Sequence, residues 1–319
     1  MVYPYNVTED NDVVIFMAHM DVVFPDTEEL PLYEKDGRIY CPGIGDDTAN
    51  LAALMMCAKY VAQHKPETKD CGVVFVCNSG EEGMGNLKGS RKICETYKGR
   101  IREFYSFDGT MDGLMQGAVG SARFRVTVKT EGGHSYGAFG NNNAIAKISE
   151  IINKIYSIRV PAEGKTTYNV GTIEGGTSVN TIAQEVSMLC EYRSDNENGL
   201  AYMQEKFNEI FESAKTDKVS VEVELVGLRP CEHLNDEQRA RRDKLADEAT
   251  ALLERVTGRI AKSGPASTDC NIPLSQGIPA VCYGTYYGAG AHTREEYVEK
   301  DSLKLGYVIA FESVLKYFK

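Results

Sequence analysis

The chain has 319 residues, of which 42% are hydrophobic and 25% are charged, and its formal net charge is -11. This length allows one large domain or two moderate ones, either of which can bury a core. No apolar run approaches the roughly 18 residues that span a bilayer, and the acidic balance excludes nucleic acid as the expected partner, because phosphate binding needs a clustered basic surface.

The first part of the chain alternates short apolar runs with longer amphipathic ones. Val13 to Asp21 is a β-branched, apolar run that ends in polar residues, and residues 71–79 and 102–109 repeat this pattern. Between the first two runs, Asp36-Gly37 predicts a hairpin turn, and residues 50–64 have the spacing and length of a buried helix. Strands that alternate with helices predict a mostly parallel sheet, in which ligands bind beyond the carboxyl ends of the strands.

The pattern changes near Gly117, where residues 121–130 alternate apolar and polar side chains with period two. This alternation is typical of a sheet with one wet face. The region predicts a β-α-β-β-α-β order. The remaining elements expected in it are helices at 144–158 and 199–214 and strands at 168–174, 185–193 and 219–226.

We therefore predict an α/β protein of two domains. Residues 1–116 and 231–319 form a catalytic, metal-binding domain with flanking helices, and residues 117–230 form an inserted α+β lid domain of ferredoxin-like type. A long helix from Asp236, the strand IPAVCYG and a final helix at 301–317 return the chain to the first domain.

The polar residues at the predicted strand ends have the composition of a site for two neighbouring divalent ions. Such a pair needs a carboxylate that bridges both ions, further oxygen and nitrogen ligands, and an open position for water. His19 is a candidate ligand, Asp21 is placed to orient its imidazole, and Asp46 lies in a Gly-rich turn from which it can bridge. Glu81 and Glu82 are adjacent and cannot point the same way, so one can bind metal while the other takes a proton from the water.

Two further candidates complete this group. Asp108 ends the third strand, and His292 lies in the loop GAGAHTREE, whose small residues let the backbone crowd against a metal centre.

In this order, the motifs resemble those of the co-catalytic zinc exopeptidases, and of the peptidase T-like members in particular. That superfamily also includes carboxypeptidase G, aminoacylase and acetylornithine deacetylase. The likeness extends from about Val13 to the C-terminus. The motifs that carry it are His19-x-Asp21, Gly45-Asp46-Asp47, Glu81-Glu82-Gly83, Ser106-Phe107-Asp108-Gly109, Gly132-Gly133-His134-Ser135, Glu191-Tyr192-Arg193 and Gly290-Ala291-His292.

The resemblance implies a centre of two divalent ions, with zinc as the expected metal, and Glu81 as the general base. It also implies a non-proline cis peptide bond between Asp46 and Asp47. The two ligand sets that it implies share one carboxylate and consist of His19, Asp46 and Asp108 for one ion, and Asp46, Glu82 and His292 for the other.

For the inserted domain, the resemblance implies contacts with substrate. His134 matches a histidine that reaches the substrate from the partner subunit, while Asn180 and Arg193 match residues that bind a substrate carboxylate. A homodimer formed through the inserted domain follows from this comparison.

Asp at position 108 favours an aminopeptidase, dipeptidase or tripeptidase, since carboxypeptidase-like and desuccinylase-like members more often carry Glu there. An N-acyl amino acid deacylase with the same metal centre is one alternative. Relatives also carry several dozen residues ahead of the H-x-D strand, which here begins at Val13. A catalytically inactive relative that binds peptide or metal and lacks the N-terminal element is therefore a second alternative.

The nine cysteines form no CxxC pair, and Cys57, Cys77 and Cys190 lie inside apolar runs. This pattern predicts reduced core thiols and a cytoplasmic protein. The N-terminus lacks the basic start and apolar core of a signal peptide. We expect a small peptide or an N-acyl amino acid as the substrate, and no membrane partner.

Overall fold

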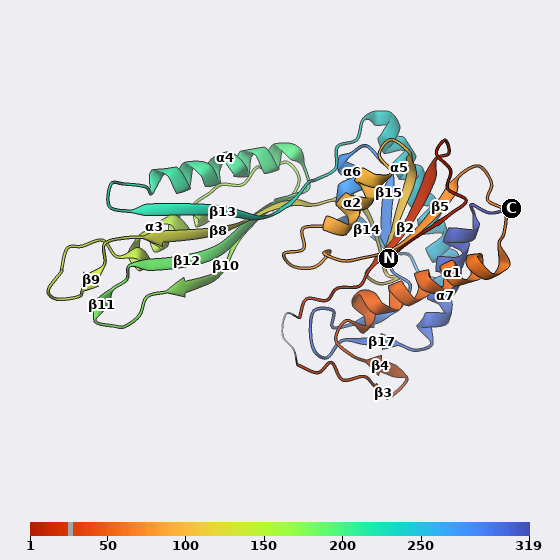
Figure 1. Cartoon of the computed structure of the whole chain (residues 1–319), viewed down its shortest axis with the longest axis horizontal. Coiled ribbons are helices and arrows are strands. Elements are labelled where there is room, and N and C mark those ends of the chain that lie inside the picture. The colour runs from red at the N-terminus through yellow and green to blue at the C-terminus, as the bar shows by residue number, and fades with distance from the viewer. Residues whose placement is uncertain (25–27) are drawn as a thin grey trace. The chain divides into compact units, whose positions relative to one another are not determined.

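The computed structural model describes residues 1–24 and 28–319, and the chain divides into two compact units (Figure 1). The main unit consists of residues 1–118 and 232–319, and the inserted unit of residues 119–231. These boundaries lie two residues and one residue from the expected ones. No helix in the described ranges is both long and apolar enough to cross a membrane.

A seven-stranded mixed sheet forms the middle of the main unit, with the order β1-β5-β2-β6-β15-β7-β14. As the alternating pattern predicts, most neighbouring strands are parallel; β1 runs antiparallel to β5, and β15 runs antiparallel to β7. The strands are β1 (Val2–Tyr5), β2 (Val13–His19), β5 (Gly72–Asn78), β6 (Ile101–Phe107), β7 (Gly113–Ala118), β14 (Lys262–Ala266) and β15 (Ala280–Tyr283).

Helices cover both faces of this sheet, which explains why the central strands are apolar on both sides. Val14 and Phe16 of β2 pack with helices α1, α5 and α7, whereas Val13 and Ile15 point the other way, toward α2 and α6. The helices are α1 (Asn50–His64), α2 (Lys88–Thr96), α5 (Asp236–Thr257), α6 (Asn271–Ser275) and α7 (Ser302–Leu315).

The carboxyl ends of the central strands are level with one another. His19 at the end of β2 pairs with Asn78 at the end of β5, and Met17 pairs with Ser106 near the end of β6. The polar residues that follow each strand therefore emerge at the same edge of the sheet.

A small sheet of order β16-β17-β4-β3 joins two distant parts of the main unit. The Asp36-Gly37 hairpin was correctly predicted: both residues have positive φ and connect β3 to β4. Strand β4 pairs in turn with β17, which brings the segment before Asp46 close to the segment after His292. The strands are β3 (Tyr33–Lys35), β4 (Arg38–Tyr40), β16 (Gly288–Ala289) and β17 (Tyr297–Glu299).

The inserted unit is an antiparallel four-stranded sheet of order β10-β12-β8-β13, with α3 and α4 packed on one face (Figure 1). Along the chain its main elements follow the β-α-β-β-α-β order. They are β8 (Gly120–Lys129), α3 (Ala144–Tyr156), β10 (Thr166–Gly175), β12 (Glu185–Ser194), α4 (Glu197–Ser213) and β13 (Ser220–Arg229). A two-stranded ribbon of β9 (Gly133–His134) and β11 (Thr181–Ile182) lies at one end of this sheet.

Candidate metal centre

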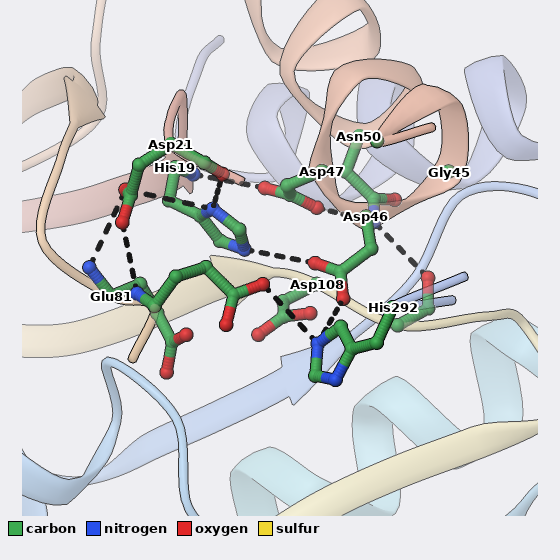
Figure 2. Close-up of polar contacts among 12 residues, drawn as sticks. His19, Asp21, Gly45, Asp46, Asp47, Asn50, Glu81, Asp108 and His292 are labelled. Carbon is green, nitrogen blue, oxygen red and sulfur yellow. Dashed lines mark hydrogen bonds and ion pairs between the residues drawn. The ribbon is translucent and has the colours of Figure 1, made fainter. Parts of the chain in front are cut away.

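Asp46 lies between two imidazoles at the carboxyl edge of the main sheet (Figure 2). Its Oδ1 is 3.1 Å from His19 Nε2, and its Oδ2 is 3.0 Å from His292 Nε2. The peptide bond between Asp46 and Asp47 is cis, as the resemblance implies. One carboxylate therefore faces two nitrogen donors through its two oxygens, which is the arrangement that a bridging ligand requires.

Three overlapping groups in the described parts of the chain each bring candidate ligand atoms within 4.8 Å of one another. They are His19, Asp46, Asp47 and Asp108; His19, Glu81 and Glu82; and Asp46, Glu82 and His292. Both expected ligand sets are contained in these groups, and His292 Nε2 is 3.2 Å from Glu82 Oε1. Imidazole and carboxylate donors in this number suit a pair of zinc-class ions.

His19 is oriented by the backbone of Asp21. The imidazole Nδ1 lies 3.0 Å from the carbonyl oxygen of Asp21, and the tautomer that donates this hydrogen bond leaves the Nε2 lone pair facing Asp46. Although Nε2 is only 3.1 Å from Asp46 Oδ1, it is buried and makes no hydrogen bond of good geometry. Without a bound ion the Asp46 carboxylate stabilises a proton on this nitrogen, and a metal ion would take the place of that proton.

The carboxylate of Asp21 was expected to orient the imidazole of His19, but it supports the turn that follows β5 instead. It lies 3.8 Å from His19 Nδ1, too far for a hydrogen bond. Instead, Oδ1 accepts from the backbone N–H of Gly80 at 2.9 Å, and Oδ2 accepts from that of Glu82 at 2.9 Å. Asp21 thus holds the turn that carries Glu81 and Glu82.

The charges of the centre favour cations. Burial by itself would lower the pKa of His19, but the surrounding acids, Asp46 foremost, outweigh it and raise the pKa to about 12. Burial raises the pKa of Asp108 to about 6, and the other acids close to this carboxyl contribute to the increase. A cluster that stabilises a proton on a buried histidine will also stabilise divalent ions.

Asp47 and Asn50 form a buried network behind the centre that was not predicted from the sequence. Asp47 accepts hydrogen bonds from the backbone N–H of His19 at 2.9 Å and from Asn50 Nδ2 at 2.7 Å. Asn50 also donates to the carbonyl of Gly109 at 3.0 Å and accepts from the backbone and hydroxyl of Thr285 at 2.6 and 2.8 Å. The asparagine thereby uses both of its donors and its acceptor oxygen to tie together three segments that line the site.

Two of the expected substrate residues lie together on the ribbon of the inserted unit. Thr181, which follows Asn180, pairs with His134, and the backbone N–H of Ser135 donates to the carbonyl of Asn180 at 2.9 Å. His134 is exposed, and its Nδ1 accepts from the backbone N–H of Tyr136 and of Gly137, both at 3.3 Å. Its Nε2–H is therefore left as a donor.

Arg193 lies at the other end of β12. Its Nε and Nη2 donate to the carboxylate of Glu191 at 2.7 and 3.2 Å. At about 3.3 Å per residue, β12 carries Arg193 about 26 Å from Glu185, the strand's first residue, near the ribbon. Within one inserted unit, Asn180 and Arg193 cannot bind the same carboxylate.

Known proteins share this architecture. The model of the family described as "Peptidase family M20/M25/M40" matches residues 15–316. The chain belongs to this family. Members of peptidase family M20 are hydrolases, so the protein is a metallopeptidase or a related amidohydrolase.

Relatives within the M20 family differ in what they cleave. The chain is 29% identical to the protein YqjE of Bacillus subtilis (strain 168) over 301 residues, which cover 91% of this chain and 76% of YqjE. It is 24% identical to acetylornithine deacetylase of Myxococcus xanthus over 300 residues, which cover 90% and 75% of the two chains. The crystal structure of a tripeptidase from Staphylococcus aureus has the same fold, with a TM-score of 0.74, 24% identity, and coverage of 98% and 83%.

Proposed function

We propose that the protein is a dinuclear-metal exopeptidase that cleaves amide bonds in small peptides, as an aminopeptidase, dipeptidase or tripeptidase. The observation that carries this proposal is the Asp46 carboxylate shared between His19 and His292. The tripeptidase fold and Asp108 at the fifth ligand position support a peptide substrate.

Each residue of the centre has a role in this proposal. Two divalent ions, zinc by preference, would polarise the amide carbonyl and lower the pKa of a water between them. Glu81 is buried beside Glu82, where it can take the proton of that water and pass it to the departing amine. The proposed metal ligands are His19, Asp46, Glu82, Asp108 and His292, and Asp21 holds the turn that carries the base.

The inserted unit is proposed to act as a ferredoxin-like lid that contacts the substrate. His134 offers an Nε2–H donor to the oxyanion, Asn180 lies beside it, and Arg193 can receive a substrate carboxylate. Because the ribbon and Arg193 lie at opposite ends of one unit, a small substrate that contacts all three residues needs two copies of the chain. This supports a homodimer formed through the inserted unit.

We further propose that the enzyme works in the cytoplasm. All nine cysteines are free thiols, and eight of them are buried, which is typical of proteins from a reducing compartment.

An N-acyl amino acid deacylase is the second candidate, and the match to acetylornithine deacetylase favours it. Protein reconstituted with zinc should be assayed against matched panels of dipeptides, tripeptides and N-acetyl amino acids. Faster turnover of the peptides supports the proposal, and faster turnover of the N-acetyl compounds supports the deacylase. Zinc binding without turnover of either panel would support the inactive relative.

Glu81→Gln tests the proposed base. The variant should keep both ions, because Glu81 belongs to neither proposed ligand set, and its amide hydrolysis should fall by about 100- to 10,000-fold, the usual contribution of a positioned base. Zinc content and kcat are measured together. Glu95→Gln, on the exposed face of α2, is the matched control and should behave like the wild type. A turnover near that of the wild type would remove Glu81 from this role.

A further inference from the structure

We propose that Glu296 is a positioning residue that sets the separation between Asp46 and His292, although it is not one of the proposed metal ligands. This inference rests on the metal centre proposed above. It concerns how two distant loops are kept close enough to share that centre.

Glu296 is 2% exposed, and its carboxylate accepts three backbone hydrogen bonds from one turn. Its Oε2 accepts from the N–H of Gly43 at 2.6 Å, and its Oε1 accepts from the N–H of Gly45 at 2.9 Å and of Asp46 at 2.7 Å. Hydrogen bonds to a buried carboxylate are short and strong. Glu296 therefore holds the backbone of the proposed bridging residue directly.

The main chain of Glu296 also holds the segment that leads into this turn. The N–H of Cys41 donates to the carbonyl of Glu296 at 3.2 Å, and strand β17 begins at the next residue and pairs with β4. His292 lies four residues before Glu296, in a loop so close that a Cβ on Gly290 would be 3.1 Å from the Cα of Glu296. One residue thus ties the turn of Asp46 to the loop of His292.

Only a carboxylate on a side chain as long as glutamate can accept from all three backbone N–H groups. A glutamine side chain would replace one oxygen with an NH₂ group, which would face a backbone N–H as a second donor. An aspartate is shorter by one methylene and would pull away from at least one of the three N–H groups. The side chain is therefore matched to the turn, and neutral or shorter substitutes should loosen it.

The two proposed ligand sets depend on Glu296 to different degrees. Asp46 and His292 belong to the set that the Glu296 contacts bring together, with Glu82 as third member. The other set shares Asp46, but its two remaining members, His19 at the end of β2 and Asp108 after β6, are held by adjoining strands of the main sheet. A loosened turn should therefore weaken the ion of the His292 set more than the ion of the His19 set.

Zinc titration of the metal-free protein tests this inference. The two zinc affinities are measured by competition with a chromophoric chelator for the wild type, Glu296→Gln, Glu296→Asp and the control Glu295→Gln, whose side chain is exposed one position away. We expect Glu296→Gln to lower one of the two zinc affinities, that of the His292 set, by at least 10-fold and the other by less than threefold. Excess zinc should restore much of the lost activity, and Glu295→Gln should match the wild type.

Equal loss of both zinc affinities together with a lower thermal midpoint would show a merely structural role and overturn the inference. Zinc affinities in Glu296→Gln equal to those of the wild type would overturn it as well. If Glu296→Gln does not fold, Glu296→Asp, which keeps the charge, must show the same selective loss, and its absence overturns the inference too. A wild-type protein that binds no pair of zinc ions would instead overturn the proposed metal centre.

Discussion

The two histidines of the proposed metal centre are held in very different ways. His19 ends a buried strand, is 2% exposed, and is bonded through both its backbone N–H and its Nδ1. His292 has a side chain that is 58% exposed and a backbone φ of 66° in a loop, and its Nε2 faces Asp46 and Glu82. Loss of His292 should therefore empty one metal position without damage to the core.

His292→Ala should lower the zinc content from two ions to about one, because the remaining oxygen ligands of its set hold zinc weakly. Zinc is measured by atomic absorption after dialysis against metal-free buffer. His64→Ala is the control, since His64 is exposed and its contacts are with Tyr60, whose carbonyl it hydrogen-bonds and whose ring it stacks on. An unchanged zinc content in His292→Ala would exclude this residue from the ligand set.

At the scale of elements, helix α7 lies against the backbone that supports the site. A Cβ on Gly306 of α7 would be 1.5 Å from the carbonyl oxygen of Thr285, so no side chain fits between them. Thr285 in turn donates two hydrogen bonds to Asn50 at the start of α1. The close packing of α7 thus supports Thr285 and, through it, the Asn50 network behind the metal centre.

Gly306→Ala should destabilise the protein by about 1 to 3 kcal/mol, the usual cost of an overpacked core, even though alanine favours a helix over glycine by about 1 kcal/mol. Urea unfolding monitored by circular dichroism gives the difference in free energy of unfolding. Gly264→Ala is the control, because its Cβ would meet no heavy atom within 4 Å. An unfolding midpoint for Gly306→Ala equal to or above that of the wild type would contradict the close packing of α7.

At the scale of the whole molecule, the burial of the cysteines shows how tightly both units are packed. Eight of the nine cysteines are buried, and Cys41 is partly buried. Burial raises the pKa of Cys57, Cys94 and Cys190 to about 12, so the reactive thiolate form is scarce at neutral pH.

The native protein should therefore show one slowly reacting thiol at pH 7.5, and nine after unfolding in guanidinium chloride, when measured with a chromogenic disulfide reagent. Cys41 is the expected reactive group, although burial raises its pKa as well, so its rate should increase with pH. Cys41→Ser should abolish the native reaction. Several fast thiols in the folded wild type would contradict the packing of the buried cysteines.

The longer elements could be predicted from the sequence because each has a local cause. The helix Asn50–His64 was predicted at its observed bounds, and the strand predicted from Val13 forms as β2, since their apolar patterns are long and regular. Short elements such as β1, α2 and β14 were not predicted. Each has few residues, and its stability comes from neighbours that are distant in the chain.

His19, Glu82 and Asp108 could be proposed as ligands because they follow apolar strands, and parallel strands end at one edge of a sheet. Asp46 and His292 lie in loops and were proposed from the order of the motifs.

The residues that hold these ligands in place could not be predicted from the sequence. Glu296 binds the turn at Gly43, which is 253 positions away, and Asn50 binds Thr285, which is 235 positions away. These partners are mostly backbone groups, which carry no residue-specific signal, so only the tertiary fold determines which side chains hold the centre in place.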